Sequence, residues 1–166
     1  MSTIQETGRN VRELLSVEAF SNVTATVLDN NPDMEREIAE RIVAEAIKFV
    51  VACAAFPGES FRPSRIVDEG WHALILNSHI YTRFCNKLAG RYVHHVPQRP
   101  DPSRHDPGEL ERTQAAITRA GYTPDRTLWL APDDPSITVQ VRATCEHSPP
   151  PPNGTCTGDC SNTGPN

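Results

Sequence analysis

The stretch NPDMEREIAERIVAEAIKFVVACAAFPG, residues 31–58, carries the clearest fold signal in the chain. Its apolar residues recur every three or four positions, which predicts a helix with one buried face. Charged residues occupy the opposite face up to Phe49, and beyond it that face disappears, so we expect a buried helix end. The Asn-Pro pair at 31–32 predicts the helix start, with Asn as N-cap, and the Pro-Gly pair at 57–58 predicts its end. The predicted apolar face consists of Met34, Ile38, Ile42, Ala46, Ile47 and Val50.

Helical periodicity continues on both sides of this central helix. A first helix, beginning near Val11 or Ser16, is predicted to stop at a turn-forming Asp-Asn-Asn cluster. A third helix is predicted to begin after Ser64, a favourable N-cap residue. It either continues unbroken to a stop at Gly90 or restarts at the Asn-Ser pair at 77–78.

The composition changes at Pro97, because twelve of the fifteen prolines lie at or beyond it. A capping-box sequence at 106–109 predicts one more helix. Alternating apolar residues over 136–143 predict one short strand, for which residues 127–130 are the candidate partner. From Ser148 onward, consecutive prolines and small polar residues are typical of disorder.

These patterns together predict an all-α fold, a bundle of four to five helices with a proline-rich, partly disordered C-terminal extension. The helical domain is expected to span 1–97, with its most informative motif at 62–97. Residues 98–143 are expected to form an extension with one helix and a short strand, and 144–166 a disordered tail rich in cysteine and proline.

Charge and hydropathy exclude several classes of function. The formal net charge is −5 and the isoelectric point is near 5.6, which argues against a nucleic-acid binder or a polybasic membrane anchor. The longest apolar run, residues 49–56, is too short to cross a bilayer, and the first residues lack the apolar core of a signal peptide. A soluble, cytoplasmic protein is therefore expected.

A cluster of histidines marks the middle of the chain, where four of the six lie within 24 residues. Asp68 precedes His72 by four residues, so on a helix the two side chains lie on one face. His79 follows seven residues later and, on an unbroken helix, falls within an arc of roughly 40° of the other two. His94 or His95 could fold back as a further ligand, and because neighbours in extended backbone point to opposite sides, only one is expected to face inward.

Two interpretations of this cluster follow from its residue types. A carboxylate and imidazoles form a ligand set that suits a divalent metal such as zinc or iron, whose open position could activate water or bind a substrate. In a simpler catalytic version, His72 acts as a general acid or base oriented by Asp68. In the structural interpretation, the same two residues form a hydrogen-bonded pair that locks the helix to its neighbour.

The sequences VDEGWH at 67–72, FC at 84–85 and GRYVHHVP at 90–97 carry a family resemblance. They resemble the core motif of the glycine-rich domain-containing protein family in its short bacterial form. That family is one of largely unknown function, so the resemblance implies a compact helical domain more than an activity. It gives weight to Asp68, Trp71, His72, Tyr81, Cys85, His94 and His95, and it leaves His79 outside the motif.

Trp71, Tyr81 and Cys85 are expected to support the cluster. Tyr81 and Cys85 are four residues apart, and on an unbroken helix they would face away from the histidines. A break in the helix at 77–78 would allow them to turn toward the histidines. The simpler interpretation for both is packing in the core, where Cys is common and Tyr finds one hydrogen bond.

The tail offers a second ligand set, composed of Cys145, His147, Cys156 and Cys160. Three thiolates and one imidazole could hold zinc, although the spacing is unusual. A reversible disulfide between Cys156 and Cys160, a processed C-terminal segment, and a disordered tail with incidental cysteines are the other interpretations.

Two functions from different classes remain open at this point. In the first, the protein depends on a metal or on histidine chemistry centred on Asp68 and His72, and it could be an enzyme. In the second, it is a non-catalytic interaction module whose proline-rich tail binds a protein partner. The two differ in whether Asp68, His72 and either His94 or His95 converge around a point that solvent can reach.

Overall fold

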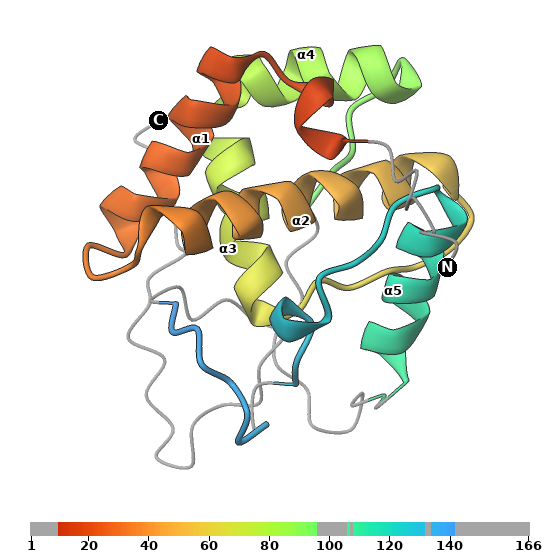
Figure 1. Ribbon diagram of the computed structural model, residues 1–166. Helices are drawn as coiled ribbons and strands as arrows, with labels where there is room; N and C mark the ends of the chain where they lie inside the picture. The colour runs from red at the N-terminus through yellow and green to blue at the C-terminus, as the bar shows by residue number, and fades with distance from the viewer. Residues whose placement is uncertain (1–9, 96–105, 107, 132–133, 142–166) are drawn as a thin grey trace, which may run out of the picture.

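Helix α2 (Arg36–Ala55) is the central element of the computed structural model, which describes residues 10–95, 106, 108–131 and 134–141. Figure 1 shows α2 crossing the middle of the molecule, with α4 above it and α5 beside its C-terminal end. The all-α prediction is confirmed, because the described residues contain five α-helices and no strand. The other elements are η1 (Val11–Leu14), α1 (Val17–Asn30), α3 (Arg65–Leu76), α4 (Ser78–Ala89), α5 (Glu109–Arg119) and η3 (Arg126–Leu128).

The apolar stripe of α2 forms the middle of the hydrophobic core, as its periodicity predicts. The four residues from Phe49 to Ala52 are all buried, as expected, but the helix end is not, because Cys53 and Ala54 are half-buried and Ala55 is exposed. Helices α1, α3, α4 and α5 all pack against α2, so one helix supplies a contact surface to every other. The stripe and the final turn contribute Ala39, Ile42, Val43, Ala46, Ile47, Phe49, Val50, Val51 and Ala52 to the core.

The start of α2 differs from the prediction, because Asn31 does not cap it. The helix begins at Arg36, and its N-cap Glu35 makes no side-chain capping bond. The Asn31 side chain instead donates to the carbonyl of Val27, 2.8 Å away, and to Oε1 of Glu69, 2.9 Å away. The Val27 carbonyl at the end of α1 also accepts from the Asn31 backbone amide, so the side chain adds a second donor there and supplies one to the buried Glu69 carboxylate.

Gly70 allows α3 to pack closely against α2. A Cβ added there would lie 2.7 Å from the backbone oxygen of Ile42 and 2.9 Å from the Cβ of Ala46. No larger residue fits without moving a helix, so Gly70 lets the two backbones approach. Ser64 begins α3 as predicted, with its side chain accepting a hydrogen bond from the Val67 amide.

The chain breaks between α3 and α4 at Asn77, which decides between the two predicted alternatives. The Asn77 side chain donates to the carbonyl of Ala73 and to Oγ1 of Thr26 on α1, both at 2.9 Å. Asn77, rather than Ser78, is the N-cap residue of α4, and its carbonyl accepts from the Tyr81 amide. Gly90 ends α4 in the left-handed conformation, with φ of 65°.

Buried polar contacts hold the segment after α5 against α2. Glu45 is 1% exposed, and its carboxylate accepts from Lys48 and from the indole nitrogen of Trp129. Lys48 also donates to the carbonyl of Thr123, 2.7 Å away. A charge in the core needs such partners, and two of these three contacts join residues that are more than 70 positions apart.

The predicted strand at 136–143 is wrong for the residues that the structure describes there, 136–141. The proposed partner segment, 127–130, contains part of the 3-10 turn η3 and offers no extended edge for pairing. The alternation itself has a different cause, since Ile137, Val139 and Val141 pack against the core as isolated extended chain. A period-two pattern indicates one-sided burial, but it does not supply a neighbouring strand.

No helix in the described part of the chain has the length and apolar character needed to cross a membrane. The cytoplasmic location stays a prediction. The predicted disordered tail, 144–166, lies outside the described residues, and so do residues 96–105 around the predicted domain boundary. That division of the chain remains a prediction as well.

Candidate metal centre

Asp68 and His72 lie on one face of α3, as their four-residue spacing predicts. The Asp68 side chain is only 2% exposed, whereas the His72 side chain is 26% exposed. Asp68 Oδ2 lies 3.4 Å from His72 Nδ1. The pair therefore spans the distance from the core to the surface along a single helix turn.

His95 approaches the same carboxylate from the segment after α4. Its Nε2 lies 3.3 Å from Asp68 Oδ1, and its side chain is 12% exposed. The His95 ring also contacts the rings of Trp71 and His72, with centroids 4.4 and 4.7 Å away. One ligand atom from each of Asp68, His72 and His95 can be chosen so that all three lie within 4.8 Å of one another.

Two polar atoms in this cluster are buried without a hydrogen bond to any described residue. They are Asp68 Oδ2 and His72 Nδ1, the two atoms that face each other. A carboxylate oxygen only accepts, and an imidazole nitrogen without a proton also only accepts. The two atoms are compatible when Nδ1 carries a proton that it donates to the carboxylate, or when a cation lies between them.

His94 does not belong to the cluster. It is exposed, and its ring packs on Tyr92 with centroids 4.8 Å apart. The buried side chain of Val93 precedes it and the inward-facing His95 follows it. Alternation in an extended segment thus turns one histidine of the pair outward, as expected from the residue order.

His79 is exposed on α4, away from the cluster. The seven-residue spacing from His72 would have aligned the two rings only on an unbroken helix. Because the chain breaks at Asn77, the stripe from Asp68 through His79 does not exist.

Tyr81 and Trp71 form the support of the cluster, in an arrangement that the sequence did not predict. The Tyr81 hydroxyl accepts from the Trp71 indole nitrogen, 2.9 Å away, and donates to the carbonyl of Val93, 2.6 Å away. Burial raises the pKa of Tyr81 well above its ordinary value, and the neighbouring Cys85 adds to this effect. The phenol therefore remains protonated and keeps its donor.

The two cysteines of the described region are free thiols inside the helices. Cys85 is fully buried on α4, which matches the packing interpretation. Burial raises the pKa of Cys53 on α2 to about 12, with Arg91 acting in the opposite direction. The tail set of Cys145, His147, Cys156 and Cys160 lies outside the described residues, so it stays a prediction.

Sequence analysis missed Glu69, which is 1% exposed next to Asp68. Its Oε1 accepts from Asn31, and its Oε2 has no hydrogen bond to a described residue. Neighbours on a helix are about 100° apart, so Glu69 faces α1 while Asp68 faces His95.

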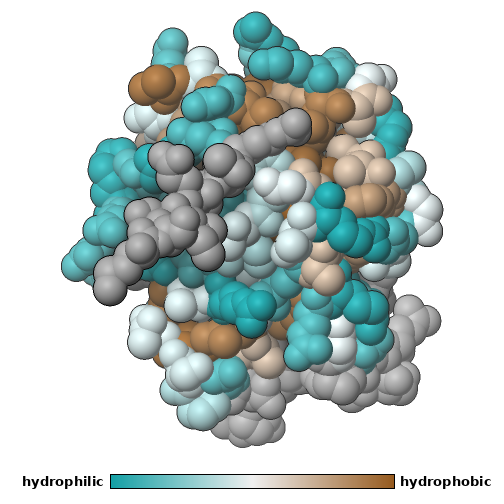
Figure 2. All heavy atoms as spheres, turned by 45° about the vertical axis from the view of Figure 1, so that its right-hand side comes forward, coloured by the Kyte–Doolittle hydropathy of each residue, from teal (hydrophilic) through white to brown (hydrophobic). Residues whose placement is uncertain are grey.

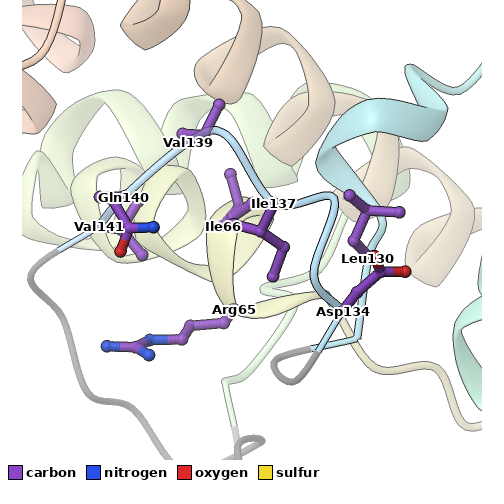
Figure 3. A pocket seen from close by; sticks show the side chains of 8 residues that line it. All are labelled: Arg65, Ile66, Leu130, Asp134, Ile137, Val139, Gln140 and Val141. Carbon is purple, nitrogen blue, oxygen red and sulfur yellow. The ribbon is translucent and has the colours of Figure 1, made fainter.

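The hollow drawn in Figure 3 is separate from this cluster. It lies where the extended segment 137–141 passes the start of α3, with Ile137 beside Ile66, and its volume is about 200 Å³. No residue of the cluster lines it. On the face shown in Figure 2, hydrophilic side chains separate the apolar areas from one another. The large apolar side chains most exposed in the described part are Val17 and Leu76.

A model of the UCP032817-like family matches residues 10–113, which is well over half of the chain. The chain belongs to the UCP032817-like family. The matched region contains Asp68, His72 and His95, so the cluster lies inside the part that defines the family. No curated protein and no solved structure matches the chain.

The resemblance to the glycine-rich domain-containing proteins is wrong, because the matching family is a different one. Much of the apparent motif has packing roles that unrelated helical domains also need. Gly70 admits the backbone of α2, Trp71 fills the core, and Tyr81 satisfies buried polar groups. The name of the UCP032817-like family specifies no activity, so its function has to be inferred from the cluster itself.

Proposed function

We propose that this member of the UCP032817-like family binds a divalent metal ion, zinc or iron, through Asp68, His72 and His95. The observation that carries the proposal is the facing pair of buried atoms, Asp68 Oδ2 and His72 Nδ1, which have no hydrogen bond among the described residues. A cation between them would remove the cost of burying two acceptors against each other.

The spacing of the donor atoms supports the proposal. In a tetrahedral site with bonds of about 2.0–2.1 Å, neighbouring nitrogen and oxygen ligands are roughly 3.3 Å apart. The two closest approaches to Asp68 are 3.4 Å from His72 and 3.3 Å from His95. Both are long for charge-assisted hydrogen bonds, which are typically about 2.7–2.9 Å.

The donor set also indicates which chemistry the ion would perform. Two imidazoles and one carboxylate are the ligands of many catalytic zinc sites and of non-haem iron sites, and both leave coordination positions open. The partly exposed His72 side chain leaves a path to solvent. Water or a substrate oxygen at the open position would then be polarised by the ion, which is the minimum requirement for metal-assisted catalysis.

The alternative is an interaction module in which the cluster is structural. The 3.3 Å contact between His95 and Asp68 favours it, since this distance also satisfies a weak hydrogen bond. In that case the His72 imidazole carries a proton toward Asp68, and no ion is needed. The partner that the proline-rich tail would bind remains a prediction.

Metal content of the purified, untagged full-length chain tests the proposal. After loading with zinc, or with ferrous iron under anaerobic conditions, and removal of excess metal, we expect near-stoichiometric retention by elemental analysis. His72→Ala and Asp68→Asn should lose the ion while circular dichroism shows the helices intact. His79→Ala is the matched control, because it removes an exposed histidine from the adjacent helix and should retain the ion.

A variant with Cys145, Cys156 and Cys160 all changed to serine tests whether the ion is bound by the cluster or by the tail. Retention by this variant supports the assignment to Asp68, His72 and His95. Loss of the ion in this variant, with retention in His72→Ala, would move the site to the tail. Absence of metal from the wild type after both loadings would overturn the proposal and leave the structural cluster.

A further inference from the structure

The third ligand of the proposed site comes from backbone that is not helical. Asp68 and His72 are fixed by α3, but His95 lies in the segment 91–95, which follows the end of α4 and has no regular structure. The position of His95 therefore depends on what holds this segment. In metal sites, groups that orient a ligand influence affinity almost as strongly as the ligand itself.

One buried hydrogen bond fastens this segment to the helices. The Tyr81 hydroxyl donates to the carbonyl of Val93, two residues before His95, over 2.6 Å. Among the described residues, it is the hydrogen bond that ties the backbone of 91–95 to the helical core. The Tyr81 side chain is itself fully buried on α4, so it offers a rigid point of attachment.

Trp71 joins the same hydroxyl to the ring of His95. Its indole nitrogen donates to the Tyr81 oxygen, and its ring lies 4.4 Å from the His95 ring. The backbone near His95 and its imidazole are thus held by two residues that are bonded to each other. A side chain held in both places has few orientations left, which is how a metal site becomes preorganised.

We propose that Tyr81 is a positioning residue of the metal site, which sets the place of His95 through the carbonyl of Val93. This inference rests on the proposed function, since it concerns the affinity of the same site. Burial, which keeps the phenol protonated, ensures that the donor is present throughout the physiological pH range. Tyr81 itself does not touch the ion, because its hydroxyl is already occupied by Trp71 and Val93.

Tyr81→Phe tests the inference, because it removes only the hydroxyl. We expect zinc affinity, measured by competition with a chromophoric chelator, to fall by about 10–100-fold. The visible absorption of the cobalt-loaded variant should also change, since His95 would no longer reach the ion in the same geometry. Tyr92→Phe is the matched control: it removes a hydroxyl from the segment itself, and it should bind zinc like the wild type.

Zinc affinity within about twofold of the wild type, together with an unchanged cobalt spectrum, would overturn the inference and leave the metal proposal standing. If the wild type itself binds no zinc, the proposed function fails first. The two failures are thus distinguishable.

A measurement without a substitution at Tyr81 covers the case in which Tyr81→Phe does not fold. The chain has three tyrosines, at 81, 92 and 122, and all can be replaced by 3-fluorotyrosine during expression. Tyr92→Phe and Tyr122→Phe assign two of the three fluorine resonances, and the remaining one belongs to Tyr81. Once elemental analysis shows that the wild type retains zinc, a shift of the Tyr81 resonance on adding zinc supports the inference, and a resonance that does not move at saturating zinc overturns it.

Discussion

Gly70 and Asp68 lie on opposite sides of α3, and only Asp68 belongs to the cluster. The missing Cβ of Gly70 lets α3 lie against the backbone of α2 at Ile42. Asp68 is two residues earlier on the same helix and therefore on the opposite side, where its carboxylate, 2% exposed, lies against His72 and His95. A carboxylate at that depth needs a compensating charge, and a surface carboxylate does not.

Gly70→Ala is expected to destabilise the fold by about 1–3 kcal/mol, because the added methyl group overlaps the backbone oxygen of Ile42. Urea unfolding followed by circular dichroism measures the change. Gly58→Ala is the control, since a Cβ at Gly58 meets no atom within 4 Å. Equal stability of the two variants would show that α3 can move away from α2 without cost.

The pairing of Asp68 with His72 could be predicted from the sequence, because a four-residue spacing on a helix is a local property. The choice of His95 over His94 could not. It depends on the exact residue at which α4 ends and on the bond that holds Val93, and both are tertiary features. Asn31 was misassigned for a similar reason, since its buried partner Glu69 is 38 residues away.

Among the elements, the corner between α3 and α4 has the largest effect on the cluster. Asn77 ends one helix and caps the next, and it is tied to α1 through Thr26. The corner removes His79 from the histidine stripe and turns Tyr81 toward Trp71. On a continuous helix, His79 would lie on the same face as His72, and Tyr81 would point away from the histidines.

Glu45→Ala is expected to loosen the segment after α5. Removing this carboxylate leaves the Trp129 indole nitrogen and the Lys48 ammonium without their buried acceptor, at a cost of about 2 kcal/mol. Hydrogen exchange should become faster over 122–129 than over α3. Glu40→Ala removes a partly exposed ion pair with Arg12 and should change stability by less than about 1 kcal/mol.

The helices were predictable from their periodicity, but their local end signals were not all correct, since α2 begins at Arg36 and not after Asn31. Ser64 and Gly90 both act as their residue types predict. The absence of a strand over 136–141 was not predictable, because alternation indicates which side is buried and says nothing of a pairing partner. The anchoring of residues 122–129 on α2 has no local sequence signal at all, since its contacts span more than 70 positions.

At the scale of the whole molecule, the charged link between Arg41 and Asp125 makes stability depend on pH. Partial burial acts to raise the pKa of Asp125, but hydrogen bonds from Thr127 and Arg41 and the Arg41 charge outweigh it, so the pKa is lowered below 3.8. A carboxyl group with a lowered folded-state pKa stabilises the fold above its unfolded-state value. That contribution disappears as the pH falls through the folded-state value.

Asp125→Asn should therefore lower the free energy of unfolding near neutral pH, and the difference from the wild type should shrink as the pH falls below 3.8. Urea unfolding at steps from about pH 6 to about pH 2.5 measures this. In the double variant Arg41→Gln, Asp125→Asn, this pair should make no pH-dependent contribution to the free energy of unfolding. If the two free energies of unfolding differ by the same amount at every pH, the Arg41–Asp125 pair does not make stability depend on pH.

Metal binding should also be visible in the stability of the whole fold. Zinc at about 100 times its dissociation constant should add about 2.7 kcal/mol to the free energy of unfolding, because only the folded chain assembles the three ligands. Thermal unfolding with and without zinc measures the shift. His94→Ala should keep the shift and His95→Ala should lose it, although the two histidines are adjacent.

The half-buried thiol of Cys53 can report local opening of the fold. Because burial raises the pKa of Cys53 to about 12, little thiolate is present at neutral pH, so an alkylating reagent reacts slowly with the native protein. Cys85, which is fully buried, is shielded from the reagent by the core. Once the three tail cysteines are replaced by serine, the rate of alkylation reports how often the fold opens at Cys53. A bound ion would make such opening rarer, so pulse alkylation should be slower with the ion than without it, and no spectroscopic probe is needed.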